Sequence, residues 1–437
     1  MNPPAKKARL WVAAAAFVAA GGARAEGPGI HAGELLIHPD AFVLGAFDNN
    51  VFLEDSTEDP QSSGMLRAGL GVSLENRTPN KVAFEAGAGL SYRHYFESGD
   101  QFAARNTLDR ANLNGMIGFL PRSPVTVELH ENGNFRDNPA FDDTDAGFRV
   151  LDNSLGPDIR FRPGDNPESR PFELRLGYRW QAVRFIGDDA DDLNTDVGEK
   201  DAHHLRFLSS WRFLPKTAAL VEVGWTALAY AEPLPVRIAG AGGQPTDVEA
   251  NRDARPFYVT AGLKGLITRR ISTTLKAGYK NSFNAEGSSF NSLVATAELT
   301  YAIEPALRAS LGYNRDGRDS AFANFYTLNQ VYTSVDFYFL GRWSVGGKVG
   351  FDHYAYADDA GGVDRAGDSR TDPVIRGNVY AGINVKDWMT LKLDVSSVSN
   401  MSEFESGVAN PTTGDTTGLD PVAFSRQLVA LELQVNY

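Results

Sequence analysis

The last ten residues of the chain, Leu428 to Tyr437, read LVALELQVNY. From Val429 onward every second residue is apolar or aromatic, and the residues between them are small or polar. Successive side chains of a β-strand point to opposite faces, so this pattern predicts a strand with one apolar and one polar face. A chain terminus frays unless neighbours hold it. A sheet closed on itself supplies a neighbour on each side, and we therefore expect the last strand to pair with the first.

The same period of two recurs along the chain, for example over residues 82–93, 172–180 and 271–280. The lengths of these segments suit the roughly 9–11 residues that a tilted strand needs to cross a bilayer. The pattern predicts eighteen strands, near residues 40–47, 64–76, 81–96, 105–119, 125–136, 148–162, 171–186, 202–213, 218–231, 255–267, 270–282, 290–302, 306–314, 324–340, 343–356, 372–385, 389–399 and 422–437.

The connections between these segments alternate between short turns and longer loops. Short turns include 77–80, 121–124 and 341–342, whereas 48–63, 232–252 and 401–420 are long. Outer-membrane barrels have short periplasmic turns and longer outer loops, and aromatic residues at many strand ends suit interfacial girdles: Tyr92, Trp180, Trp211, Trp225, Trp343 and Tyr437. A soluble β-sandwich or propeller also alternates but has no reason to alternate its loop lengths. We predict an all-β fold, a transmembrane up-and-down antiparallel β-barrel formed by residues 26–437.

The N-terminus indicates export. Lys6, Lys7 and Arg9 precede an apolar run from Leu10 to Ala20, and Ala23-Arg24-Ala25 forms a small-residue cleavage site. This is the pattern of a secretory signal peptide, residues 1–25, and the run is too short for a membrane anchor. The chain has no cysteine, so neither a lipid-modified N-terminus nor disulfides can form.

Composition and motifs exclude several functions. With a net charge of −13, the chain is a poor candidate for nucleic-acid binding. It lacks the common catalytic and phosphate-loop motifs, so we expect no enzyme activity, no cofactor and no metal site. His203 and His204 are neighbours, and in a strand they would face opposite sides.

The polar faces of the predicted strands would line the lumen. There we assign eighteen cations against eleven anions, and rings of basic side chains favour anions in pores. Tyrosines on the same face suit sugars, which offer both C–H faces and hydroxyls, although they could also only fill space between arginines. The predicted transport path comprises Arg67, Arg93, Arg110, Arg136, Arg175, Arg179, Lys276, Arg308, Lys348, Arg376, Arg426, Tyr95, Tyr258, Tyr338, Tyr354 and Tyr380.

Two stretches resemble known families. Residues Gly45 to Phe52, GAFDNNVF, resemble the opening of a family of porin-like outer-membrane β-barrels associated with exopolysaccharide export. The resemblance implies a conduit for an acidic exopolysaccharide that works with a periplasmic polysaccharide-export lipoprotein. The last strand resembles the C-terminal signature of bacterial outer-membrane barrels, which implies recognition by the barrel-assembly machinery.

Two hypotheses for the function follow. The first is export of a polysaccharide across the outer membrane. The alternative is a general diffusion porin for small anionic solutes, which would need no periplasmic partner. In either case the loop 232–252, rich in glycine and proline, is our candidate for a constriction.

Overall fold

The structure of the protein is a computed structural model. It describes residues 27–55, 59–76, 81–137, 149–164, 171–186, 198–239, 245–303, 306–320, 323–357, 370–403, 405–409, 416–421 and 423–437. The predicted signal peptide lies outside the described residues.

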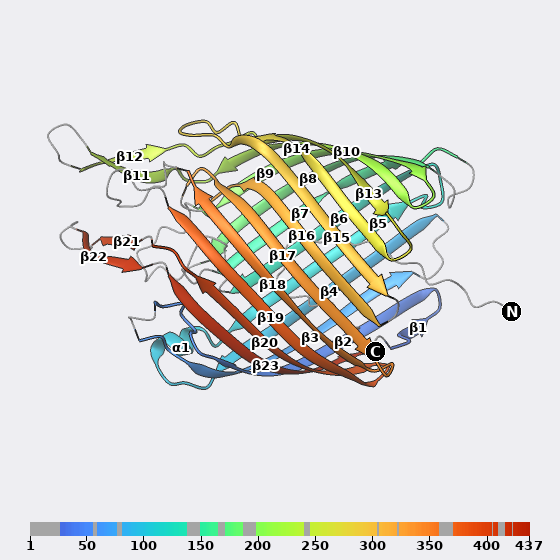
Figure 1. The fold of residues 1–437 in the computed structure, drawn as a ribbon, viewed down its shortest axis with the longest axis horizontal. Coiled ribbons are helices and arrows are strands. Elements are labelled where there is room, and N and C mark those ends of the chain that lie inside the picture. The colour runs from blue at the N-terminus through green and yellow to red at the C-terminus, as the bar shows by residue number, and fades with distance from the viewer. Residues whose placement is uncertain are drawn as a thin grey trace.

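Eighteen strands in the described part of the chain form one closed antiparallel barrel (Figure 1). Each pairs with the next along the chain, and the last returns to the first. They are β2 (Leu35–Asp48), β3 (Ser63–Asn76), β4 (Val82–Tyr95), β5 (Leu108–Phe119), β6 (Val125–Asp137), β7 (Arg149–Phe161), β8 (Phe172–Ile186), β9 (Lys200–Leu214), β10 (Thr217–Tyr230), β13 (Phe257–Leu266), β14 (Ile271–Asn281), β15 (Asn291–Ile303), β16 (Leu307–Arg318), β17 (Tyr326–Phe339), β18 (Trp343–Tyr356), β19 (Thr371–Lys386), β20 (Met389–Asn400) and β23 (Phe424–Asn436).

The seam between the first and last strands confirms the expectation drawn from the C-terminal stretch. β23 lies between β20 and β2, and its register with β2 runs from Asp40 opposite Asn436 to Asp48 opposite Leu428. The Tyr437 backbone N–H donates a hydrogen bond of 3.0 Å to the Pro39 carbonyl oxygen. The C-terminus is therefore held on both sides.

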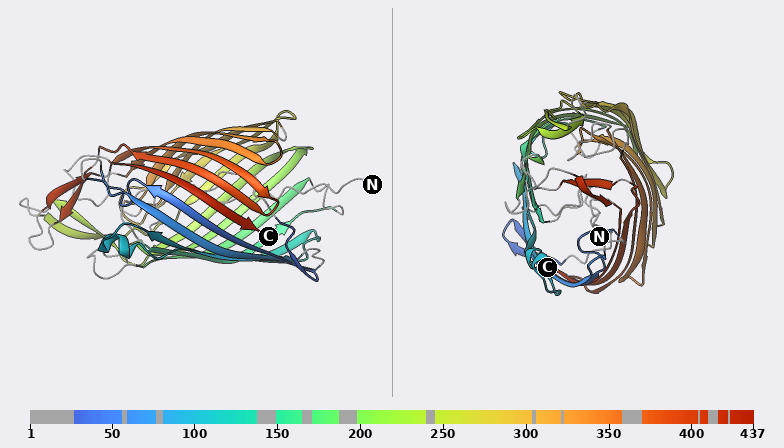
Figure 2. Two further views of the ribbon diagram at one scale, coloured as in Figure 1. Left: turned by 90° about the horizontal axis from the view of Figure 1, so that it is seen from below. Right: turned by 90° about the vertical axis from the view of Figure 1, so that its left-hand side faces the viewer.

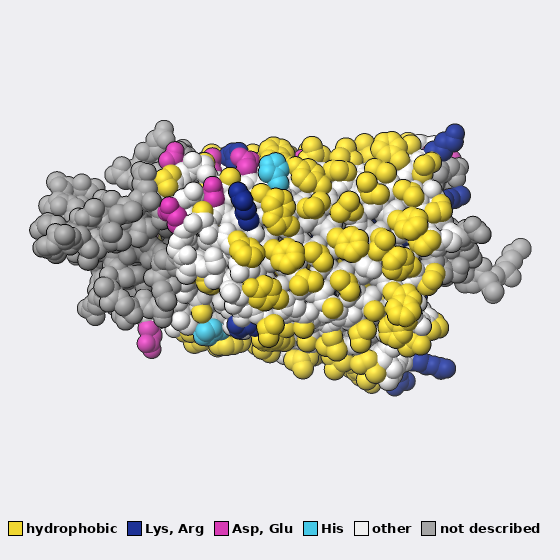
Figure 3. Space-filling model, turned by 90° about the horizontal axis from the view of Figure 1, so that it is seen from above, with side chains coloured by type: hydrophobic (Ala, Val, Ile, Leu, Met, Phe, Trp, Pro, Cys, Tyr) yellow, Lys and Arg dark blue, Asp and Glu magenta, His cyan; other side chains and the backbone are white. Residues whose placement is uncertain are grey.

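The outer face of the barrel is apolar. Outward residues such as Leu70, Leu90 and Val379 are exposed, and apolar side chains cover the wall between two charged ends (Figure 3). All six aromatic residues expected at the girdles are at least one third exposed. A closed barrel with an apolar outer belt satisfies every strand hydrogen bond within lipid. The protein is a transmembrane β-barrel of the bacterial outer membrane.

Among the residues that the structure describes, no helix is long and apolar enough to cross a membrane.

The structure contains short elements that strand periodicity does not predict. They are β1 (Ile30–Ala32), α1 (Asp100–Ala104), and the two hairpins β11 (Leu234–Ala239) with β12 (Pro245–Ala250) and β21 (Glu405–Ala409) with β22 (Thr416–Pro421). The first barrel strand also begins at Leu35 rather than near residue 40. The hairpin β11–β12 extends past the rim, at the end opposite the C-terminus (Figures 1 and 2), so these two strands do not form the constriction predicted for 232–252.

Three buried clusters lie at the long-loop ends of the barrel strands. One contains Tyr326, Tyr354 and Tyr356 with neighbouring small and aliphatic residues. A second contains Val51, Met65, Tyr95 and Phe102, and a third Ala202, Leu228 and Ala254. The hairpin β21–β22 crosses the opening when the barrel is viewed end-on (Figure 2). Below these clusters, the lumen is lined by the charged residues of the wall.

Candidate functional site

The strand register places all sixteen residues of the predicted path on the inward face of the barrel, but they differ in accessibility. Three are exposed, namely Arg110, Arg136 and Arg308. Nine are partly exposed: Arg67, Arg175, Arg179, Lys276, Lys348, Arg376, Arg426, Tyr258 and Tyr338. Four are buried: Arg93, Tyr95, Tyr354 and Tyr380. The buried four cannot contact a passing solute, so they are wall residues and not part of a transport surface.

Several inward tyrosines lie flat across a glycine of the neighbouring strand. Tyr380 stands opposite Gly346, which stands opposite Asp336, and Tyr380 Oη donates a 2.7 Å hydrogen bond to that carboxylate. Without a side chain at the glycine, the ring can cross the intervening strand.

The same arrangement recurs elsewhere on the wall. Tyr332 crosses Gly312 to reach Glu298. Tyr258 also lies over a glycine, Gly224, but its 2.8 Å hydrogen bond goes to Glu222 of that same neighbouring strand. Of the two interpretations of the tyrosines, space filling fits this geometry better than sugar stacking. Tyr332 was absent from the predicted set although it shares the inward face of its strand with Tyr338.

The inner wall carries more carboxylates than the sequence analysis assigns. Asp109 is the clearest example, because a register shift beside Ser91 and Tyr92 brings it inward although its neighbour Arg110 also faces inward. It forms a 2.6 Å ion pair with Arg67. Further inward carboxylates are Asp40, Asp48, Asp152, Asp316 and Asp372. The predicted excess of cations is therefore too large, and the inner wall is close to charge balance.

The basic and acidic side chains of the inner wall nevertheless differ in how far they are exposed to the lumen. The Arg206 side chain is 47% exposed and that of its partner Glu222 is 11% exposed. Arg426 and Asp48 are 28% and 0% exposed. In three pairs the carboxylate is the more exposed partner, namely Lys280–Asp316, Arg160–Glu173 and Lys200–Asp319. Short carboxylate side chains stay against the wall, whereas long arginine and lysine side chains reach over them into the lumen. The accessible layer is therefore mainly basic.

Some inward cations make no hydrogen bond or ion pair through their side chains within the described ranges. Arg110 and Arg136 stand opposite each other at the long-loop end of β5 and β6. Arg212, Lys264 and Arg308 lie near the short-turn ends of β9, β13 and β16. Both ends of the lumen thus present cations whose side chains make no hydrogen bond or ion pair to a described residue.

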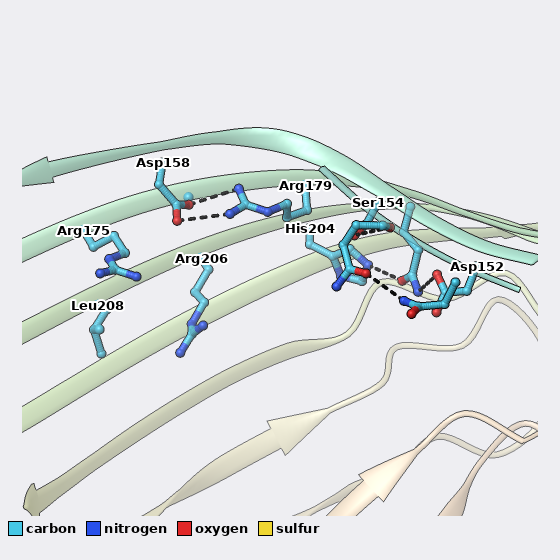
Figure 4. A pocket seen from close by; sticks show the side chains of 12 residues that line it. Asp152, Ser154, Asp158, Arg175, Arg179, His204, Arg206 and Leu208 are labelled. Atoms are coloured by element: carbon cyan, nitrogen blue, oxygen red, sulfur yellow. Dashed lines mark hydrogen bonds and ion pairs between the residues drawn. The ribbon is translucent and has the colours of Figure 1, made fainter. Parts of the chain in front are cut away.

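Strands β6 to β9 form a recess of about 280 Å³ in the lumen wall (Figure 4). Gly177 lies in its floor, between Asp158 on one strand and Arg206 on the next. Arg179 holds both oxygens of Asp158 at 3.1 Å, while Arg175 and Arg206 point into the recess beside this pair (Figure 4). We call this space the β6–β9 recess.

The upper part of the β6–β9 recess is polar and mostly uncharged. Asn132, Ser154 and Gln181 form one row across three strands. His204 Nε2 lies 3.0 Å from Gln181 Oε1, and the Gln181 amide donates a 2.8 Å hydrogen bond to Asp152. The predicted path omitted these neutral residues because it was selected by charge and by tyrosine, although the same alternation places them inward.

One group on the wall has the composition of a metal site. Glu128, His130 and Asp158 bring three ligand atoms within 4.8 Å of one another. Arg160 already forms a 2.8 Å ion pair with Glu128, and Arg179 holds Asp158. These guanidinium groups neutralise the carboxylates and would repel a cation, so the group favours an ion-pair network. His203 and His204 face opposite sides, with His203 stacked on Tyr178 outside.

A loop after β16 reaches across to β9 and β10 at the mouth. Lys200 Nζ forms an ion pair with Asp319, and Tyr230 Oη donates a 3.3 Å hydrogen bond to the same carboxylate. The Asp319 side chain is 43% exposed, so desolvation raises its pKa only in part, and the charge and hydrogen bond of Lys200 outweigh this and lower the pKa to about 2. The loop is therefore tethered by an ionised carboxylate at neutral pH.

No family model matches the chain, and no curated protein matches it. Solved structures of similar shape include OpdK of Pseudomonas aeruginosa with vanillate, which is 13% identical with a TM-score of 0.48, covering 92% of this chain and 99% of that one. OccK2 (OpdF) of the same organism is 10% identical with a TM-score of 0.49, covering 92% and 98%. The siderophore receptor PirA of Pseudomonas aeruginosa is 10% identical with a TM-score of 0.42, covering 91% and 80%. Structural similarity at this level of identity and TM-score does not identify a solute. The barrel fold is established by the strand pairing described above.

Proposed function

We propose that this barrel is a diffusion channel for small anionic solutes across the outer membrane. The observation that carries the proposal is the difference in depth between the two signs of charge on the inner wall. Carboxylates such as Glu222 and Asp48 lie beneath the cations that pair with them, and unpaired cations stand at both ends of the lumen. A solute in the lumen would meet guanidinium and ammonium groups first.

Passage would proceed by weak serial contacts. A carboxylate or phosphate could exchange from Arg110 and Arg136 at the mouth to Arg175 and Arg206, and then to Arg212 near the periplasmic end. Each guanidinium offers donors that suit planar anions. Because most of the inward cations that the structure describes already share a carboxylate or another acceptor, no single contact would hold the solute tightly. Conduction requires such a balance between entry and release.

Export of an acidic exopolysaccharide stays a second prediction, taken from the resemblance of residues 45–52. The side chains of Asp48 and Asn50 in that stretch are buried at the seam, so they would not touch a polymer. The polysaccharide, the periplasmic lipoprotein and the barrel-assembly machinery remain predicted partners, and the absence of enzyme activity remains a prediction.

The test is ion selectivity of the purified protein in planar bilayers. We expect a steadily open pore whose reversal potential in a KCl gradient gives a higher permeability for chloride than for potassium. Arg175→Gln with Arg206→Gln should reduce that ratio severalfold, because both guanidinium groups face the lumen. Arg184→Gln is the matched control, since Arg184 lies on the outer face, where it pairs with Asp201.

Two outcomes would contradict the proposal. A potassium-selective pore would overturn the argument from charge depth. A pore that stays closed unless a periplasmic lipoprotein is added, together with loss of surface polysaccharide on gene deletion, would favour the export hypothesis instead.

A further inference from the structure

We propose that the β6–β9 recess is a binding subsite for small hydroxylated carboxylates, such as sugar acids. The inference rests on the proposed function, since it assumes that anions enter the lumen, and it names the class of solute that the wall would retain. It follows from how charged and neutral polar groups are distributed within the recess.

The lower part of the recess can bind a carboxylate. Arg206 uses its Nε to pair with Glu222 at 2.9 Å, which leaves the guanidinium end directed into the lumen. Arg175 lies two residues before Gly177, and its ion pair with Glu173 is long, at 3.5 Å. A Cβ at Gly177 would clash with Asp158, so the glycine makes room for that carboxylate, which Arg179 neutralises. Arg175 and Arg206 beside this neutralised pair can donate to the two oxygens of a bound carboxylate.

The upper part of the recess can bind hydroxyl groups. The side chains of Asn132 and Asn134 offer amide donors and acceptors, and Ser154 adds a hydroxyl. Gln181 is already bonded to Asp152 and His204, which fixes its amide at the edge of this row. Asn134 donates a 2.7 Å hydrogen bond to Asn132, which fixes the amide orientation and leaves the Asn132 amino group free to donate within the described surroundings. Neutral amides bind hydroxyls without demanding a second charge. The recess therefore suits an anion whose body carries several hydroxyls.

The lining argues against aromatic carboxylates. No phenylalanine, tyrosine or tryptophan is among the described residues that line the recess, and Leu208 is the one large apolar side chain there. The imidazole of His204 is the one aromatic ring among them, and both of its nitrogens already contact Thr226 and Gln181. A benzoate ring would leave the amides without partners, which costs binding free energy. The volume of about 280 Å³ lies near the lower end of ligand pockets. A monomeric sugar acid is a better fit than a long or flat molecule.

The experiment compares blocking of the chloride current by sodium glucuronate and by sodium benzoate in planar bilayers. Both anions carry one negative charge, so a difference in their blocking concentrations reports the contribution of the neutral polar groups of the recess. We expect glucuronate to reach half-block at a concentration about tenfold lower than benzoate. Asn132→Leu with Asn134→Leu should remove most of this preference while chloride selectivity stays unchanged.

The control is Asn112→Leu with Asn114→Leu. These two asparagines lie inward on β5, directly opposite Asn134 and Asn132, and their side chains turn toward the glycines of β4. This double variant should keep the preference for glucuronate. Retention of the heat-modifiable band on a gel confirms that each variant is a folded barrel.

The outcomes separate the two proposals. A chloride-selective pore that glucuronate and benzoate block equally would overturn the subsite and leave the channel intact. Equal loss of preference in both double variants would also overturn it, because the effect would then not belong to the recess. A pore without chloride selectivity would contradict the proposed function itself.

Discussion

Tyr380 donates a hydrogen bond of 2.7 Å to Asp336, although a whole strand lies between them. The ring passes over Gly346, which pairs with both residues in the register of β17, β18 and β19. Three strands are thereby joined by one side chain in addition to their backbone ladder. The tyrosine side chain therefore links the three strands on the lumen face, and it holds the Asp336 carboxylate against the wall.

This arrangement predicts that Gly346→Ala destabilises the barrel. A Cβ at this position would lie 2.7 Å from the Tyr380 ring and 2.8 Å from Asp336, so the ring would have to move. Overpacking of this kind costs about 1–3 kcal/mol. Gly377→Ala is the matched control, because nothing lies within 4 Å of a Cβ there. Urea unfolding in detergent, followed by tryptophan fluorescence, measures the difference; equal stability of the two variants would show that the ring is not fixed.

The period of two was enough to predict the barrel, its closure and the inward position of the arginines. It could not predict how deeply a side chain is buried, because burial of Tyr95 depends on Val51, from the segment after β2, and on Phe102, from helix α1. It also could not predict Asp109, since one register shift turns two adjacent residues to the same side. Alternation reports the face of a strand, whereas accessibility and bulges depend on neighbours distant in sequence.

The seam depends on Asp48 and Arg426. The Arg426 side chain donates to both oxygens of Asp48, with Nε at 3.0 and 3.1 Å, while the Asn50 amide donates to the Ser425 carbonyl oxygen. The stretch that resembles a porin-like family thus fastens the first strand to the last. Asp48→Asn should cost about 1.5–3 kcal/mol, the contribution of hydrogen bonds to a charged group.

The readout is the temperature at which the compact band converts to the unfolded band on a gel. Asp48→Asn should lower it by several degrees and leave the conductance of the surviving pores unchanged. Asp316→Asn is a useful comparison, because its more exposed pair with Lys280 should contribute less. A larger fall for Asp316→Asn would contradict the assignment of the seam.

The tether of the β16–β17 loop should be insensitive to pH over the physiological range. The folded pKa of Asp319, about 2, lies below the roughly 3.9 of an unperturbed aspartate. The stabilisation by Lys200 is therefore fully present above about pH 4 and is lost as the pH falls through about 2. Lys200→Met should increase current fluctuations at pH 7, whereas Lys264→Met, which removes an unpaired cation, should not. Fluctuations of the unaltered protein that change between pH 5 and pH 8 would show that another group controls the loop.

Glu131 is a carboxylate on the lipid-facing side of the barrel. It stands opposite Gly115 and the outward Leu155, and the inward residues of its strand are the even-numbered ones, such as Glu128. Its side chain has no hydrogen bond or ion pair to any described residue. A charge in the apolar belt is unfavourable in lipid, so Glu131→Leu should stabilise the barrel by about 1 kcal/mol. Unfolding from phospholipid vesicles is the appropriate measurement, with Asn114→Leu, an inward polar residue, as the control. Destabilisation by Glu131→Leu in lipid would mean that the carboxylate has a partner in the membrane, because removing a charge that contacts only lipid should not destabilise the barrel.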